Sequence, residues 1–593
     1  MYCFTSPLQF NEFNEFNEHT HRLSSEFQET TDIFDTIYRP LLFETTTTSL
    51  TPYQLQIAHA LFHSYSSDPI TIKNMQQLLK STLKHTHSIR RYAESAQNIE
   101  QSWFDLLTLN EFSQTYQFID FSILAHFNTN TDFMLIKGWM TLLSPITALL
   151  LPMITIVFTC IALYVQGHGV NFHYLCTSAL CESSIGQLLT QFKTTNLTNL
   201  LYLALTAGFY LLSMYQNIRS SYQYYQNLSK IQSYLEQTQS LVENSIQVLN
   251  EMFSSTSFFL HKTKKRAKHF TLLQQHLHSH ILPTLQAILE EIKDTSNHIG
   301  KTMTLFYKLK HDTNYVEVID FAIGFGHYLG CIHRVATHPS LHFCKITKKQ
   351  LTFKNIFYPA HLFDSQSHTH IVKNDIDLTT QNMILSGPNA SGKTTLLKTV
   401  FVNLLLSQQF GKGCYSSMHF QPFTHFHSYL NIPDTSGRDS LFQAEAKRCK
   451  QIIDSIENNQ HKKHFCIFDE LFSGTNPEEA TQCAIAFITY LNNKQQQTSF
   501  LLTTHFHQLC KEIQTLNLKH TSNFQMNKMH CLEEGISTTK NGCETLKQLN
   551  FPTSIIQSIN QSINQSTQLD QLDQLDQLNQ SINSTNSINS IKH

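Results

Sequence analysis

The pattern of hydrophobic and polar positions changes character along the chain. Between residues 52 and 132, apolar residues recur at mixed three- and four-residue steps with almost no glycine or proline, which is typical of packed α-helices. From residue 228 to 299, a heptad-like seam of apolar residues predicts two long helices, which we expect to be antiparallel. From residue 382 onward, short apolar runs are joined by glycine-containing turns and helical patterns, which indicates an α/β domain.

Two long runs without charged residues lie between these regions. Residues 138–181 contain no Asp, Glu, Lys or Arg, and within them 142–165 form an apolar run of 24 residues. About 20 residues are enough to cross the hydrocarbon core of a bilayer. A second run, 198–216, is shorter. We predict a two-helix transmembrane hairpin, with a pair of buried core helices as the alternative.

The basic residues around this hairpin predict its orientation. Lys137 precedes it, and Arg219 and Lys230 follow it, whereas the connecting loop carries Lys193. Because basic residues favour the cytoplasmic side, both flanks are expected in the cytoplasm, which agrees with an even number of spans.

Composition and charge restrict the possible classes of protein. A chain of 593 residues is too long for one hydrophobic core, and a formal charge of -2 gives no global basic surface for nucleic acid. Thirteen cysteines without dense spacing predict free thiols in a reducing compartment. The threefold Phe-Asn-Glu repeat at 10–18 and the tail 559–593 are low-complexity segments that we expect to be poorly ordered.

A basic cluster lies in the predicted turn between the two long helices. If the first helix runs straight for about 40 residues, this turn lies about 60 Å from the membrane, so lipid headgroups are not its expected target. Contact with DNA phosphates is the functional interpretation, and a solvated helix turn is the alternative. The cluster comprises Lys262, Lys264, Lys265, Arg266 and Lys268.

Residues 382–400 predict an apolar strand, a glycine-rich turn and the start of a helix. The turn fits the phosphate-binding loop pattern at every fixed position. In such a loop the glycines let backbone N–H groups face phosphates, the lysine reaches the β- and γ-phosphates, and the last hydroxyl reaches Mg²⁺. We therefore predict an ATP and Mg²⁺ site formed by Gly387, Pro388, Asn389, Ala390, Ser391, Gly392, Lys393 and Thr394.

Two further strands predict the residues of hydrolysis. The apolar run 464–468 ends in adjacent carboxylates, of which Asp469 can hold Mg²⁺ through its water shell and Glu470 can orient the attacking water. The strand 498–504 leads into His505, whose imidazole could sense the γ-phosphate or help to position that water.

A Ser-Gly turn precedes the helical pattern of residues 441–456. Ser436 and Gly437 would present N–H groups and a hydroxyl to an anion. In an ATPase that binds nucleotide between two copies, this turn would close the site of the other subunit.

These elements, in this order, resemble the MutS family of ABC-type ATPases. The similarity includes Asn374-Asp375, the Gly-Pro-Asn opening of the loop, Ser-Gly-Arg and Thr504-His505-Phe506. It extends over residues 316–558, where 542–556 is similar to the family's helical dimerisation element, and it is weaker over 52–315.

The resemblance implies specific roles for residues of this chain. It implies phosphate binding from Gly387 to Thr395, Mg²⁺ at Thr394 and Asp469, hydrolysis by Glu470 with His505, and Ser436 acting in trans in a homodimer. It also implies DNA binding and DNA mismatch repair. Ile371 stands near the place where the family usually has an aromatic residue against adenine.

The N-terminus is where the chain departs from the family. The family's mismatch sensor uses a Phe-x-Glu motif in a separate N-terminal domain. Phe10, Asn11 and Glu12 match that spelling, but the tandem repeat explains them more simply. We therefore expect a membrane-anchored variant without this domain.

The expected fold class is α+β and multidomain, with a helical lever region, a transmembrane hairpin and an α/β P-loop ATPase domain of the MutS type. We expect a polar N-terminal segment at 1–50, helical core at 51–135, the hairpin at 136–218, coiled-coil arms at 219–315, the ATPase domain at 316–558 and a tail at 559–593.

The leading functional hypothesis is a membrane-tethered, dimeric MutS-like ATPase whose ATPase domain lies in the cytoplasm and whose helical arms close on DNA. The alternative is a membrane-associated mechanical or scaffold ATPase that does not bind DNA. A solute transporter is disfavoured, because two spans per subunit carry no intramembrane charge that would suggest a path.

Overall fold

The computed structural model describes residues 20–22, 33–43, 50–165, 197–254, 275–295, 298–363, 371–388, 390–430, 432, 440–494, 496–537, 547 and 550–559. The Phe-Asn-Glu repeat, the loop 166–196, the basic cluster 262–268 and the tail from residue 560 lie outside the described residues. The chain divides into two units. Unit 1 comprises residues 1–18, 41–61 and 77–337, and unit 2 comprises residues 19–40, 62–76 and 338–593.

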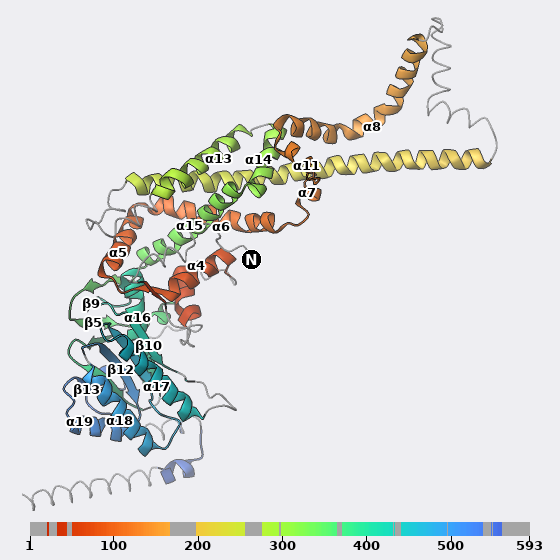
Figure 1. Cartoon of the computed structure of the whole chain (residues 1–593). Helices are drawn as coiled ribbons and strands as arrows, with labels where there is room; N and C mark the ends of the chain where they lie inside the picture. The colour runs from red at the N-terminus through yellow and green to blue at the C-terminus, as the bar shows by residue number, and fades with distance from the viewer. Residues whose placement is uncertain are drawn as a thin grey trace, which may run out of the picture. The chain divides into compact units, whose positions relative to one another are not determined.

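Unit 1 is helical (Figure 1). In its centre, α6 packs against both α11 and α15, and α11 also contacts α8 and α13. Trp103, Tyr92 and Ile99 of α6 are fully buried there, because this helix turns one apolar face toward its neighbours. Its longer helices are α6 (Thr86–Thr108), α8 (Thr131–Val165), α11 (Leu197–Ser254), α13 (Leu282–Asp294), α14 (Ile299–His311) and α15 (Thr313–Thr337). Its shorter helices are α7 (Phe112–Thr115), η2 (Ala125–Thr129) and η3 (Leu277–Ile281).

Helix α11 is a single helix of 58 residues. It joins the second predicted span, 198–216, to the predicted lever without a break. The predicted apolar seam is buried at Ile231, Leu235, Val242 and Leu249. Two polar seam positions are also buried, because their hydroxyls find partners: Thr238 donates to the Tyr234 carbonyl at 2.9 Å, and Ser245 donates to the Tyr92 hydroxyl at 3.1 Å.

The second predicted helix ends before its predicted seam does. The helical stretch that includes η3 and α13 ends at Asp294, and α14 begins at Ile299 after a short break. The break is stabilised by His298, whose Nδ1 accepts the Lys301 N–H at 3.2 Å as an N-cap. The seam of α13 is buried as predicted, but α11 and α13 also pack against α14 and α15. The seam thus lies in a helical bundle rather than in a two-stranded coiled coil.

Two helices among the described residues are long and apolar enough to cross a membrane. One is the window Thr131–Leu150 of α8, of which 11% is buried, and the other is α15, Thr313–Thr337, of which 67% is buried. Helix α15 is therefore a core helix of unit 1. Helix α8 is bent (Figure 1), and its sequence contains Pro145 and Pro152, each of which lacks the N–H of a regular helical hydrogen bond.

Unit 2 is built on a six-stranded sheet with the order β10-β11-β12-β7-β13-β14. The first five strands are parallel and β14 is antiparallel. The strands are β7 (Asn382–Ser386), β10 (His425–Tyr429), β11 (His464–Asp469), β12 (Thr498–Thr504), β13 (Thr521–Met526) and β14 (Leu532–Glu534). The connecting helices are α16 (Lys393–Phe410), α17 (Leu441–Asn458), α18 (Pro477–Asn493) and α19 (His507–Thr515). Because the strands are parallel, the carboxyl ends of β7, β11 and β12 meet at one edge of the sheet.

A smaller sheet adjoins it, with the order β4-β9-β5-β6, and a two-stranded sheet pairs β3 with β8. These strands are β3 (His342–Phe343), β4 (Lys345–Ile346), β5 (Leu351–Ile356), β6 (Asn374–Asp377), β8 (Lys412–Gly413) and β9 (Ser417–Phe420). A 3-10 turn, η4 (Pro359–Leu362), follows β5.

Segments from the N-terminal part of the chain belong to unit 2. They comprise β1 (Thr20–Arg22), η1 (Phe34–Tyr38), the end of α4 (Pro52–His63), β2 (Ser64–Ser66) and the start of α5 (Pro69–Lys84), while α3 (Arg39–Leu42) spans the division. Their anchor is the end of α16, where the Gln409 amide donates to the Phe62 carbonyl at 2.8 Å and accepts from the Tyr38 hydroxyl. This division differs from the expected one, which began the C-terminal domain at residue 316 and gave it no N-terminal residues.

Candidate active site

The glycine-rich loop 387–392 connects β7 to α16, as the strand-turn-helix pattern predicts. Gly392 caps the helix with a φ of 93°, and Ala390 has a φ of 62°. A Cβ atom at Gly387 would lie 2.9 Å from Ser391 Oγ, so a larger residue here would displace the Ser391 side chain. Asn389 lies outside the described residues. Two residues of the loop thus have the left-handed backbone that is typical of a tight, phosphate-binding turn.

Lys393 lies buried behind this loop. Its Nζ donates to the carbonyls of Gly387 at 2.8 Å and Pro388 at 3.0 Å, and lies 4.0 Å from Glu470 Oε1. Burial lowers the pKa of Lys393, although the nearby carboxylates of Glu470 and Asp469 oppose this effect. The ammonium group therefore lies between the Glu470 carboxylate and two backbone carbonyls, and a bound anion could replace the carbonyls as hydrogen-bond acceptors.

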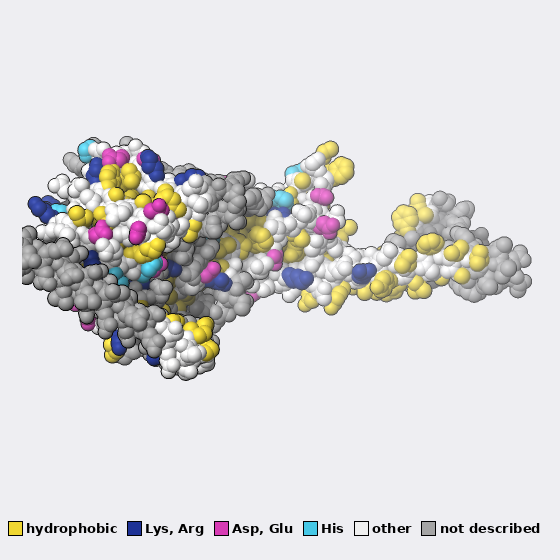
Figure 2. Space-filling view, turned by 90° about the horizontal axis from the view of Figure 1, so that it is seen from below, with side chains coloured by type: hydrophobic (Ala, Val, Ile, Leu, Met, Phe, Trp, Pro, Cys, Tyr) yellow, Lys and Arg dark blue, Asp and Glu magenta, His cyan; other side chains and the backbone are white. Residues whose placement is uncertain are grey.

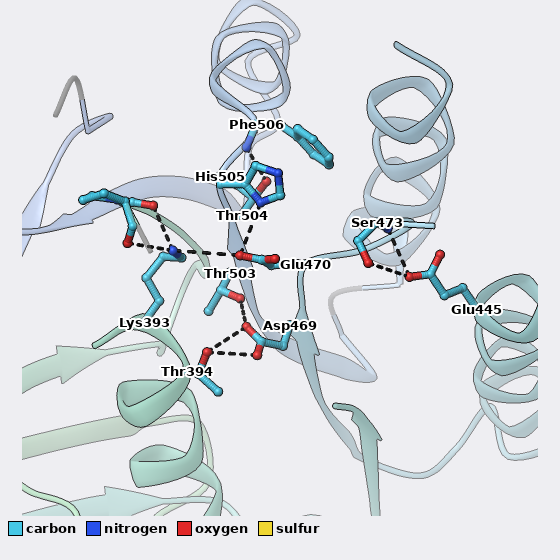
Figure 3. Close-up of polar contacts among 12 residues, drawn as sticks. Lys393, Thr394, Glu445, Asp469, Glu470, Ser473, Thr503, Thr504, His505 and Phe506 are labelled. Carbon is cyan, nitrogen blue, oxygen red and sulfur yellow. Dashed lines mark hydrogen bonds and ion pairs between the residues drawn. The ribbon is translucent and has the colours of Figure 1, made fainter. Parts of the chain in front are cut away.

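Asp469 ends β11 and contacts two hydroxyl groups. Thr394 Oγ1 donates to Asp469 Oδ2 at 2.9 Å, and the Thr503 hydroxyl donates to Oδ1 (Figure 3). The structure thus brings together the two residues that the sequence predicts for Mg²⁺. Thr503 was not predicted, although its position on β12 two residues before His505 places it beside Asp469.

Glu470 and His505 contact each other at the same edge of the sheet. His505 Nδ1 lies 3.3 Å from Glu470 Oε1, and the two side chains are 43% and 32% exposed (Figure 3). The hydrogen bond from His505 lowers the pKa of Glu470, in spite of its partial burial, and the charges of His505 and Lys393 act in the same direction. The partly exposed carboxylate is therefore open to a water molecule.

A turn after β13 adds residues that the sequence did not predict. His530 Nδ1 lies 2.8 Å from the Ser391 carbonyl, and its backbone has a φ of 58°. Asn374 holds this turn, because its side chain accepts the Leu532 N–H at 2.8 Å and donates to the His530 carbonyl at 3.3 Å. Asn374 belongs to the sequence pattern that resembles the MutS family, whereas nothing in the sequence distinguishes His530 from the other histidines.

Two sets of predicted residues lie outside the described residues. These are the Ser436-Gly437 turn and the basic cluster 262–268. Helix α17, which follows the turn, begins with a capping box in which Ser440 accepts the Gln443 N–H and the Gln443 side chain accepts the Ser440 N–H.

The part of the chain that contains this site is similar in sequence to known proteins. Residues 383–567 match the sequence profile of MutS domain V. The match begins in β7 and includes Lys393, Asp469, Glu470 and His505. The comparisons support membership of the MutS family.

The relatives match over part of their length. The chain is 28% identical over 238 residues to Endonuclease MutS2 of Lactobacillus gasseri, which covers 37% of this chain and 29% of the relative. It is 27% identical over 291 residues to Endonuclease MutS2 of Finegoldia magna, covering 47% and 34%. It is 29% identical over 204 residues to the human MutS protein homolog 4, covering 31% and 21%. The chain thus spans about a third or less of the length of these relatives.

Proposed function

We propose that this chain is a MutS-like ATPase that binds ATP with Mg²⁺ at the carboxyl edge of the unit 2 sheet and hydrolyses it. One observation carries the proposal: Lys393, the Thr394–Asp469 pair and the Glu470–His505 pair converge on that edge from three neighbouring strands. The similarity to MutS domain V supports it.

The residues of the loop fit a nucleotide phosphate. Ser391 Oγ is buried and has no hydrogen-bond partner among the described residues, which leaves a hydroxyl available to an anion. Lys393 would exchange its carbonyl partners for phosphate oxygens, and Thr395 would follow the loop at the start of α16. We assign the phosphates of ATP to Gly387 through Thr395.

The Mg²⁺ ion would be held by Thr394 and Asp469. A hydroxyl and a carboxylate are hard oxygen ligands of the kind that Mg²⁺ prefers. When bound, the ion neutralises charge on the phosphates of the transferred group.

Glu470 is the residue that we assign to the attacking water. Its lowered pKa keeps the side chain a carboxylate at neutral pH, so that it can accept a hydrogen bond from the water. His505 holds the carboxylate in place by contacting Oε1, which leaves its other oxygen to the water.

We further propose a membrane-tethered homodimer with unit 2 in the cytoplasm. Helices α8 and α11 contact each other where Ser221 donates to the Leu142 carbonyl at 3.0 Å. Many apolar side chains that the structure describes on these two helices are exposed, and Figure 2 shows hydrophobic side chains gathered along the helices. Those that are more than half exposed include Ile146, Ile154, Val157, Phe158, Leu201, Phe209 and Leu211. Such a surface suits contact with lipid.

In the proposed dimer, Ser436 and Gly437 would face the nucleotide of the partner subunit.

Two proposals remain for the partner of the helical arms. The similarity to proteins named Endonuclease MutS2 and MutS protein homolog 4 favours a DNA-repair role, with phosphate contact by residues 262–268. The alternative is a membrane mechanical or scaffold ATPase without DNA. Binding of matched and mismatched duplexes, with and without ATP, distinguishes a mismatch sensor, a general DNA clamp and a scaffold.

Substitution of Glu470 tests the ATPase proposal. We expect Glu470→Gln to bind ATP with nearly unchanged affinity while kcat falls by at least about 100-fold, because the amide orients water but cannot accept its proton. Equilibrium ATP binding and phosphate release are the measurements, with the exposed Glu478→Gln as the control. Unchanged turnover in Glu470→Gln would remove Glu470 from the mechanism.

A further inference from the structure

Glu445 is a buried carboxylate that the proposed mechanism does not use. It lies on α17, is 2% exposed, and points toward the loop that follows β11 (Figure 3). Oε1 accepts the Ser473 N–H at 3.1 Å and the Ser473 hydroxyl at 3.0 Å, and Oε2 accepts the Gly474 N–H at 3.1 Å. Two backbone N–H groups and one hydroxyl thus depend on this one side chain.

The loop that Glu445 holds begins at the proposed hydrolytic residue. Glu470 and Phe472 have φ values of 53° and 57°, in the left-handed region that residues with a side chain rarely adopt. Such a conformation persists only where surrounding contacts determine it. Phe472 is fixed by its N–H, which donates to the Tyr429 hydroxyl at 3.1 Å, and the following two residues are fixed by Glu445.

The same contact is closely packed. A Cβ atom at Gly474 would lie 2.7 Å from Leu441 Cγ and 2.9 Å from the Phe442 backbone nitrogen, both at the start of α17. The loop therefore touches α17 by backbone approach as well as by the three hydrogen bonds of Glu445.

We propose that Glu445 is a positioning residue for hydrolysis: by holding Ser473 and Gly474 on α17, it fixes the loop in the conformation that directs Glu470 toward His505 and Lys393. The inference rests on the ATPase function proposed above. Glu445 itself contacts neither Lys393 nor the glycine-rich loop through any bond that the described residues make, and its effect on ATP passes through Glu470. The conformation of the hydrolytic carboxylate therefore depends on the position of α17.

Three variants test this role by different chemistry. Glu445→Gln keeps the size of the side chain but turns an amide NH₂ toward a backbone N–H. Gly474→Ala pushes the loop from α17 without altering a polar group. Ser473→Ala removes one of the three hydrogen bonds. Glu457→Gln, a partly exposed carboxylate on the same helix that contacts Tyr490 and Lys494 instead of the loop, is the matched control.

We expect a separation between kcat and ATP affinity. In the full-length protein, Glu445→Gln and Gly474→Ala should lower kcat by about 10- to 100-fold, because misplacement of a reacting group by about 1 Å costs up to about 100-fold. Ser473→Ala should lower it by about 3- to 5-fold. The dissociation constant for ATP should stay within about 3-fold of wild type in all variants, and Glu457→Gln should retain wild-type kcat.

Several results would overturn the proposal. Wild-type kcat in Glu445→Gln contradicts it, and so does a parallel loss of ATP binding and turnover, which a purely structural role would produce. If Glu445→Gln does not fold, Gly474→Ala and Ser473→Ala decide by the same criteria.

Hydrogen exchange separates this inference from the ATPase proposal. In Glu445→Gln the Ser473 and Gly474 amides should exchange at least about 10-fold faster than in wild type, whether or not ATP is hydrolysed. If these two amides exchange at the wild-type rate in Glu445→Gln, Glu445 does not hold the loop. If Glu470→Gln hydrolyses ATP like wild type while the Ser473 and Gly474 amides still exchange faster in Glu445→Gln, the proposed role of Glu470 in hydrolysis is refuted, but the contact made by Glu445 is not.

Discussion

Asp469 and Glu470 are neighbours in the sequence, yet different geometry holds each of them. Asp469 is the last residue of β11 and keeps the extended backbone of the strand, with its carboxylate between Thr394 and Thr503. Glu470 turns out of the strand with a positive φ and meets His505. This change of backbone conformation lets two adjacent carboxylates face different partners, one suited to a cation and the other to water.

The pH dependence of turnover should report the contact between Glu470 and His505. The pKa of Glu470 lies below its ordinary value of 4.5, so the carboxylate, and any stability from this pair, persists above that range and is lost as pH falls through the lowered pKa. In His505→Ala the largest cause of the lowering is removed, and burial raises the pKa. We expect the acid limb of the kcat profile to shift to higher pH, with kcat about 100-fold lower.

Steady-state ATP hydrolysis between pH 4 and 8 checks this expectation, and His461→Ala, an exposed histidine of unit 2, is the control. An acid limb at the same pH in His505→Ala and in wild type would mean that the two side chains are not coupled.

Individual residues differ in how far the sequence predicts them. The meeting of Thr394 with Asp469 could be predicted, because each follows a recognisable strand and parallel strands end at one edge. The role of Glu445 could not be predicted, because α17 carries many polar and charged residues and nothing in the sequence distinguishes Glu445 among them. Its burial depends on the backbone of a loop 28 residues away, which no local periodicity encodes.

At the scale of elements, the two ends of α16 have different partners. Its first residues belong to the candidate site, and its last turn binds segments of the chain more than 300 positions away. Gln408 donates to the Ser66 carbonyl at 3.0 Å and the Phe423 carbonyl at 2.8 Å, and accepts the Phe423 N–H at 2.8 Å. Contacts over such a separation leave no local sequence pattern, so the sequence does not reveal that these N-terminal residues belong to unit 2.

Removing the Gln408 amide should loosen this anchor. Gln408→Leu keeps the bulk but leaves buried backbone groups of Ser66 and Phe423 without partners, at a cost of about 2 kcal/mol. We expect the Phe423 amide to exchange about 30-fold faster in hydrogen-exchange measurements. Gln460→Leu, an exposed glutamine of unit 2, should leave this rate unchanged. Equal protection of Phe423 in Gln408→Leu and wild type would show that the amide does not hold the segment.

At the scale of the whole molecule, the apolar helices and the candidate site belong to different units. The sequence predicted the long apolar helix α8 because it lacks charge over a long stretch, and it predicted the α/β domain because its strands carry recognisable motifs. It did not predict that α13 ends early, because the break at 295–298 depends on capping by one histidine.

The proposed membrane tether predicts how the full-length chain partitions. Wild-type protein should remain with phosphatidylcholine and phosphatidylglycerol vesicles after an alkaline wash. Ile154→Lys combined with Val157→Lys should be released, because each lysine near the centre of a span costs about 3 kcal/mol. The control is Leu516→Lys, an apolar side chain of unit 2 that is 52% exposed. Release of the wild-type protein, or retention of the double variant, would contradict the tether.

The continuity of α11 has a geometric consequence. At 1.5 Å per residue its 58 residues extend about 87 Å, of which about 51 Å lies between its first residue and Ile231, where the buried seam begins. A tilt of about 5° at Ile231 displaces the far end by about 4 Å over that arm. The helix therefore converts a slight adjustment among α6, α13 and α15 into a displacement of several ångströms at its apolar end.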